Sequence, residues 1–271
     1  MRLIKAIYSK ISKYLEIYKV SFMSSSAYGK EVYGTLGFLI IILFILFFLW
    51  RAIFSIGNVD FAGFTLQKII WYVAATEAIM LSGSRIRVRI DEEIRSGNVS
   101  NFLVKPLFYP LFLAFDSLGS SVFRFIIRMP VAFLLAFIYT FKIEFSIFGF
   151  VSYLFLGLLG LFLDALINIF IGLLAFYIED TAPISWIYNK LLFTIGGLLI
   201  PIDIMPNAIK TLSKFFPARF ILYSPAMCFV NFSTELFVEG FFGLISFIFI
   251  VFLMISLLFS SASRRLSLNG G

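Results

Sequence analysis

Four charged side chains lie within or beside strongly apolar stretches of this 271-residue chain, and they are its clearest candidates for chemistry. A charge inside a membrane is costly, so such residues usually face protein or water and pair with one another. Two acids and two bases at overlapping depths would form a neutral buried network. That network would either lock helices together or take part in substrate binding and gating, unless Glu77 and Arg124 simply extend to the membrane surface. The four residues are Glu77, Arg124, Arg128 and Asp164.

The residue types and motifs of the chain give little support for acid–base, metal or nucleophilic catalysis. The chain has no His and a single Cys, Cys228, which removes the commonest general base, an intrachain disulfide and a thiolate metal cluster. The phosphate-binding pattern GxxxxGK[ST] and the nucleophile pattern GxSxG are both absent. We therefore predict no catalytic residue, no metal ligand, no cofactor and no ATP site in this chain, and we expect that it is not itself an enzyme.

The composition indicates that these residues are positioned by membrane helices. Hydrophobic residues make up 61% of the chain and charged residues only 14%, whereas soluble domains are usually about a quarter charged. A soluble enzyme, a disordered chain and a disulfide scaffold are thereby excluded. Phe supplies 37 positions spread over every apolar stretch, which is typical of side chains that face lipid.

Apolar runs predict an all-α membrane protein with one transmembrane domain over residues 1–271. A helix needs about 20 apolar residues to cross a bilayer, and six runs approach or exceed that length. Residues 107–118 are expected to form a separate, half-buried helix. The six predicted transmembrane helices are 35–54, 66–83, 120–141, 145–177, 184–200 and 241–259.

Two further segments have membrane-related patterns without being long enough to cross. In residues 1–30, apolar side chains recur at three- and four-residue steps with Lys between them, which predicts an amphipathic helix lying in the membrane interface or packed on the protein. In residues 201–239, prolines separate short apolar pieces, which predicts an extracytoplasmic re-entrant hairpin. These prolines are Pro201, Pro206, Pro217 and Pro225.

The distribution of Lys and Arg predicts the orientation. The net charge is +7, and most basic residues fall on the side of the predicted helices that holds both termini and residues 84–106. Both termini are therefore expected in the cytoplasm, in a plasma or inner membrane. The basic excess fits anionic lipid, and we expect no nucleic-acid partner.

The segment 84–106 is the most informative loop. Ile86, Val88, Ile90 and Ile94 supply an apolar side, and Gly97 is suited to end a short amphipathic helix. The alternative is a solvated loop that only sets the topology.

Two stretches resemble the ABC-2 type permeases, and in particular their uncharacterised six-span branch. They are EIRSGNVSNFLVKPL at 93–107 and GGLLIPIDIMPNAIKTLSKFFPARFILYSP at 196–225. The resemblance implies the transmembrane subunit of an ATP-driven exporter, paired with a second permease that is a copy or a relative. It implies separate ABC ATPase subunits that hold ATP and Mg and contact the N-terminal helix and the loop 84–106. By this resemblance the ATPase contact includes Asp91, Glu92, Glu93, Arg95 and Gly97.

Two functions of other classes remain open alternatives: an ATP-independent channel and an integral-membrane enzyme. A channel would show a polar stripe along one span, and an enzyme acting on lipid would show clustered polar residues at an interface. Neither pattern is visible in the sequence, and the transported substrate cannot be read from it.

Overall fold

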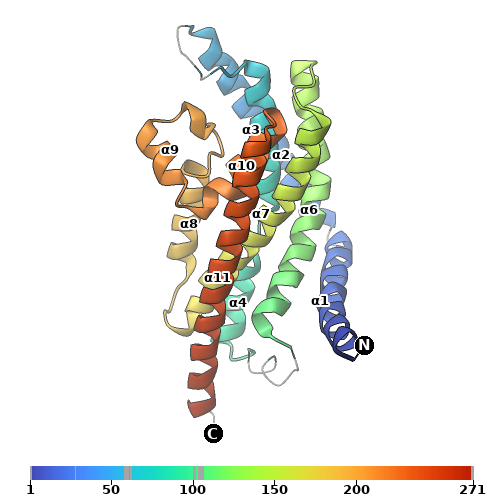
Figure 1. Ribbon diagram of the computed structural model, residues 1–271, viewed down its shortest axis with the longest axis vertical. Coiled ribbons are helices and arrows are strands. Elements are labelled where there is room, and N and C mark those ends of the chain that lie inside the picture. The colour runs from blue at the N-terminus through green and yellow to red at the C-terminus, as the bar shows by residue number, and fades with distance from the viewer. Residues whose placement is uncertain are drawn as a thin grey trace.

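In the computed structural model we describe residues 2–27, 29–57, 61, 63–99, 102 and 107–269, with side chains for the same ranges except 2–11, 29–33 and 264–269. Every regular element in this described part is a helix, which confirms the all-α prediction. The long helices run along the long axis of a bundle (Figure 1). We call the end that carries α4 and the C-terminal end of α11 the lower end, as drawn there, and the end near α9 the upper end.

Four helical stretches are long and apolar enough to cross a membrane. Their exposed surfaces are rich in Phe, Ile and Leu side chains, which water would not solvate favourably. They belong to α2 (Gly29–Ser55), α6 (Tyr109–Thr140), α7 (Ile147–Leu173) and α11 (Thr234–Asn269), and the stretches themselves are Gly34–Ser55, Tyr109–Thr140, Ile147–Phe176 and Thr234–Ser263.

The second and fifth predicted spans form shorter helices. Helix α3 (Leu66–Ser82) has 17 residues, matches the predicted boundaries closely, and is buried along most of its length between α2, α6 and α10. Helix α8 (Ala182–Thr194) has only 13 residues and ends before the Gly196-Gly197 pair. Helix length therefore supports four of the six predicted spans, and the remaining two rest on other arguments.

The predicted division of residues 107–141 into two helices was wrong. We expected a separate helix at 107–118 followed by a span at 120–141, but α6 is continuous from Tyr109 to Thr140. Pro110 lies in the first turn, where it replaces an N–H that has no helical partner. Pro130 lies inside the helix without ending it, as membrane helices tolerate when neighbouring helices surround them.

The proline-rich segment 201–239 forms short helical pieces up to residue 230, whereas its residues 234–239 already belong to α11, and a re-entrant hairpin stays a prediction. Ile202–Ile204 (η2) follows Pro201, and α9 (Asn207–Ser213) follows Pro206. After Pro217, a π-helical turn at Arg219–Tyr223 (η3) leads into α10 (Ser224–Val230), which has Pro225 in its first turn. The η3–α10 piece is buried and packs against α7, so this part of the segment belongs to the core of the bundle.

Glycine allows α7 and α10 to touch through their backbones. A Cβ on Gly149 would lie 2.7 Å from the carbonyl oxygen of Phe229 and 2.8 Å from that of Cys228. We predict that Gly149→Ala destabilises the protein by about 1–3 kcal/mol, because both neighbours are backbone atoms that cannot move independently. Gly157→Ala on the same helix is the matched control, since its nearest contact would be the Phe125 ring at 3.6 Å. Thermal unfolding in detergent measures both, and equal melting temperatures would contradict the prediction.

Candidate functional site

Several buried polar groups meet at the turn between α3 and α4 (Ile86–Arg95). Helix α3 ends at Ser82, and the N–H of Gly83 donates to Met80 O at 3.2 Å. A Cβ on Gly83 would lie 3.0 Å from Asp164 Oδ2 on α7 and 3.1 Å from Met80 O. Glycine is therefore what allows the turn to approach the buried carboxylate so closely.

Asp164 joins the turn to two other helices. Its side chain is only 5% exposed and accepts three hydrogen bonds. The Ser84 N–H donates to Oδ2 at 2.6 Å, while Tyr188 Oη on α8 and Asn168 Nδ2 on α7 donate to Oδ1 at 2.7 and 3.2 Å. A carboxylate buried in this way is stabilised only while these donors stay in place. Asp164 thus ties the α3–α4 turn to α7 and α8 together.

Two arginines of α6 hold the carbonyl groups at the end of α3. Arg124 Nη2 donates to Gly83 O at 2.8 Å and to Ser82 O at 3.3 Å. Arg128 donates to Leu81 O and, at 2.7 Å, to Thr35 Oγ1 on α2. The last carbonyls of a helix lack helical partners and carry partial negative charge, so guanidinium groups are well suited to bind them.

The four predicted membrane charges are therefore only partly brought together. Arg124, Arg128 and Asp164 surround the α3–α4 turn, whereas Glu77 is buried more than one turn earlier in α3. Within the described part of the chain, no salt bridge joins any two of the four, and both arginines bind carbonyl groups of the turn, although Arg124 still acts electrostatically on Asp164. The arginines thus form a clamp on backbone groups, and a neutral network of the four charges stays a prediction.

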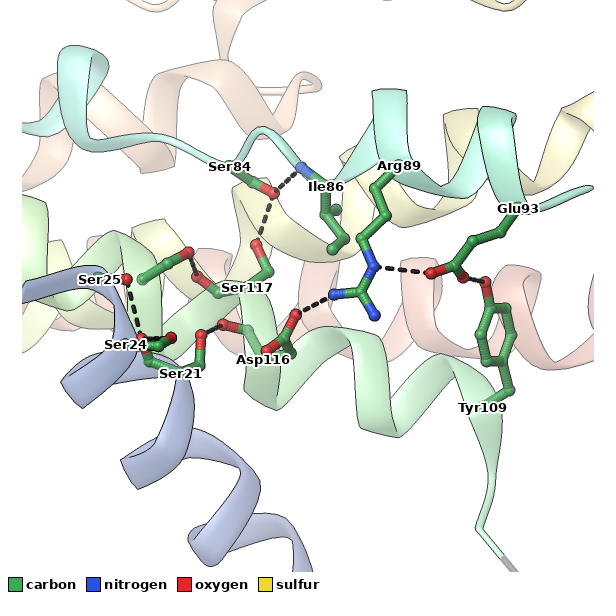
Figure 2. A network of polar contacts seen from close by, with 11 residues as sticks. Ser21, Ser24, Ser25, Ser84, Ile86, Arg89, Glu93, Tyr109, Asp116 and Ser117 are labelled. Atoms are coloured by element: carbon green, nitrogen blue, oxygen red, sulfur yellow. Dashed lines mark hydrogen bonds and ion pairs between the residues drawn. The ribbon is translucent and has the colours of Figure 1, made fainter. Parts of the chain in front are cut away.

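Helix α4 is fixed to α6 by a chain of charged and polar contacts (Figure 2). Arg89 Nε donates to Glu93 Oε1 and its Nη1 to Asp116 Oδ2, both at 2.7 Å, and Tyr109 Oη donates to Glu93 Oε2 at 2.6 Å. Partial burial lowers the pKa of Arg89, but Glu93 and Asp116 outweigh it and raise that pKa above its ordinary value. Glu93, one of the predicted ATPase contacts, is thus engaged within the chain.

The neighbouring face of α4 packs on α7. Ile90 is fully buried, and a Cβ on Gly172 would come within 2.9 Å of Ile90 Cβ. The helix ends at Arg95, with Ser96 as its cap and Gly97 following at φ +74°. This confirms that Gly97 occupies the left-handed position after the helix, which glycine adopts without strain.

The outer face of α4 borders a groove of about 550 Å³. Its second wall is the segment 179–182, which we call the turn after α7. Two hydrogen bonds link α4 to this turn: Arg87 Nη1 donates to Thr181 Oγ1 at 2.9 Å, and Arg95 donates to Glu179 O. Three of the predicted contact residues, Asp91, Glu92 and Arg95, line it. The groove is lined by Arg87, Val88, Asp91, Glu92, Arg95, Glu179, Asp180 and Ala182.

Helix α1 (Arg2–Ala27) packs on the lower half of α6. Ser21 Oγ donates to Asp116 O at 2.6 Å, next to the side chain that binds Arg89 (Figure 2). A Cβ on Gly119 would lie 2.4 Å from Tyr18 O, so the two helices meet backbone to backbone. The described part of α1 is therefore packed on the protein, and its placement in a membrane interface stays a prediction.

Several residues of the site were missed from the sequence. Ser84, Asn168 and Tyr188 complete the surroundings of Asp164, and Ser117 Oγ lies 2.6 Å from Ser84 Oγ. A cavity of about 210 Å³ opens beside Asp164 and Asn168. The LSGS stretch that ends α3 was the available signal, because a Gly between two Ser residues at a span end indicates a tight, polar turn.

Comparison with known proteins gives one family match. A family model described as an ABC-2 family transporter protein matches residues 40–270, which is most of the chain. The match includes α3, α4, α6, α7 and α8, and therefore every residue of the clamp and the groove except Thr35. No curated protein matches the chain significantly.

Proposed function

This chain belongs to the ABC-2 family of transporter proteins and is a multi-pass membrane protein, and from that premise we propose that it is the permease subunit of an ATP-driven exporter. It pairs with a second permease, a copy or a relative, and the cargo passes between the two. Separate ABC ATPase subunits supply ATP hydrolysis and hold ATP and Mg. The absence of GxxxxGK[ST] from the sequence supports this division of labour.

The proposed topology has six spans, with α3 and α8 added to the four long helices. Helix α3 is shorter than a usual span, but its burial inside the bundle removes the need for a full-length apolar surface. The lower end faces the cytoplasm in a plasma or inner membrane, because α4 and most Lys and Arg residues lie on that side. Segment 201–239 then lies toward the extracytoplasmic side and closes the path there.

The clamp on the α3–α4 turn is the observation that carries the mechanism. Helix α4 carries several charged residues and is partly exposed at the lower end. The short α3–α4 turn joins it directly to α3. An ATPase bound to α4 moves the turn, and Asp164 passes that movement to α7 and α8 through Ser84 and Tyr188. Arg124 and Arg128 keep the end of α3 attached to α6 and α2 during the movement.

Copurification tests the proposal. The tagged permease, extracted in mild detergent, should bring down a chain that contains GxxxxGK[ST], and the complex should hydrolyse ATP in a vanadate-sensitive manner. Replacing the Lys of that motif in the ATPase should abolish ATP hydrolysis, while the ATPase should stay bound to the permease. A permease that purifies alone and conducts ions or modifies lipid without ATP would instead identify the channel or the enzyme of the alternative readings.

A further inference from the structure

The groove beside α4 is acidic, although the end of the molecule that carries it is basic. Its two arginines are already engaged: Arg87 with Thr181 and Asp91, and Arg95 with Asp91 and Glu179 O. Three acidic residues remain on its rim, and none of them forms an ion pair among the described residues. The three are Glu92, Glu179 and Asp180, and all are exposed.

Two apolar residues line the groove beside its charged ones. Val88 on α4 is 48% exposed, and Ala182 is exposed on the facing wall. Exposed apolar side chains next to charged ones suit a protein–protein interface, which combines apolar contacts with a polar rim. Since Val88 and Glu92 are one turn apart on α4, one partner element can touch both.

Charge decides between a protein and the membrane as the occupant. Anionic headgroups attract basic segments, and three carboxylates would repel them. We propose that the groove receives a basic segment of the partner ATPase, whose Lys or Arg side chains bind Glu92 on α4 and Glu179 and Asp180 on the facing turn. Arginine suits these contacts because its planar fork binds carboxylates through two hydrogen bonds. This inference rests on the proposed function and adds the turn after α7 as a second element of the docking site.

Charge reversal tests the inference. The ATPase recovered with the wild-type permease is purified and titrated onto the permease in nanodiscs at several salt concentrations. The double variant Glu92→Lys/Asp180→Lys should bind it at least about tenfold more weakly, since close interfacial charges are strongly coupled. Its binding should also lose the wild-type weakening with added salt. Glu235→Lys, at an exposed residue in the first turn of α11, is the charge-matched control for the single variant Glu92→Lys, which should already bind more weakly than wild type.

The outcomes separate the two proposals. If the wild-type permease recovers no ATPase at all, the proposed function fails. If it recovers one but the double variant binds with unchanged affinity and salt dependence, the acidic docking site is overturned. The neutral variant Glu92→Gln/Asp180→Asn should give intermediate affinity, and a wild-type elution profile and melting temperature show that it is folded.

Cross-linking locates the contact independently. Cys228 is buried and is the chain's own single cysteine, so Glu92→Cys provides one accessible thiol. A thiol–amine cross-linker should join it to a Lys-containing, basic peptide of the ATPase, identified by mass spectrometry. Cross-links only to acidic or neutral ATPase peptides, or only to lipid, would overturn the inference.

Discussion

Asp164→Ala is expected to uncouple the ATPase from the membrane helices while leaving the complex assembled. The substitution removes the acceptor for Ser84 N–H and Tyr188 Oη, which then lack this partner, whereas Asn168 Nδ2 keeps its hydrogen bond to the carbonyl oxygen of residue 164. Each unsatisfied buried group costs about 1–3 kcal/mol, so the link from the α3–α4 turn to α8 should open. Any increase in ATP hydrolysis that the permease produces in its ATPase should therefore be largely lost.

Asp164→Asn is the graded control for this prediction. Its amide keeps one oxygen acceptor but presents an NH₂ group toward one of the former donors, so an intermediate loss is expected. ATP hydrolysis by the reconstituted complex is measured together with the amount of ATPase retained on the permease. Unchanged hydrolysis and unchanged thermal stability in Asp164→Ala would show that the carboxylate neither couples nor stabilises these helices.

Gly119→Val is expected to separate α1 from α6. Even a Cβ at this position would lie 2.4 Å from Tyr18 O and 3.0 Å from Phe22 N, so α1 must shift away as a unit. The shift also strains the Ser21–Asp116 hydrogen bond, which lies beside the Arg89–Asp116 ion pair of α4. Overpacking of this kind costs about 1–3 kcal/mol, and we expect reduced recovery of the ATPase in copurification because α1 and α4 are both displaced.

Gly37→Val on α2 is the matched control, because a Cβ there meets nothing within 4 Å. It should leave both the melting temperature and the recovery of the ATPase close to wild type. Equal behaviour of the two Gly→Val variants would contradict the close α1–α6 packing.

Helix boundaries could be predicted from the sequence where local signals in the chain were strong. The start and end of α3 and the left-handed Gly97 after α4 were predicted closely, because each depends on local signals in the chain. The continuity of α6 through residues 109–140 was missed, since apolar periodicity does not show whether two adjacent helical stretches are joined. The break after Thr194 in α8 was placed too late, although Gly196 and Gly197 marked it.

Less of the site could be predicted from the sequence, because its charged side chains bind mainly backbone groups. Arg124, Arg128 and Asp164 stand out as charges in apolar runs, and their shared location was anticipated. What the sequence could not indicate is that the arginines bind the carbonyls of Leu81, Ser82 and Gly83 while Asp164 accepts from Ser84 N–H. Such contacts depend on how α6 and α7 cross the end of α3, and that geometry is not a local property of any segment.

A distance measurement across the bundle tests most directly whether the clamp transmits movement from α4 to α8. Spin labels are placed at Phe48→Cys on α2 and Phe193→Cys on α8, both exposed positions, in the nanodisc complex with its ATPase. Trapping the ATPase with ATP and vanadate should change the distance between the labels in the otherwise wild-type permease and leave it unchanged with Asp164→Ala. The same change in both proteins, or no change in either, would contradict transmission through Asp164.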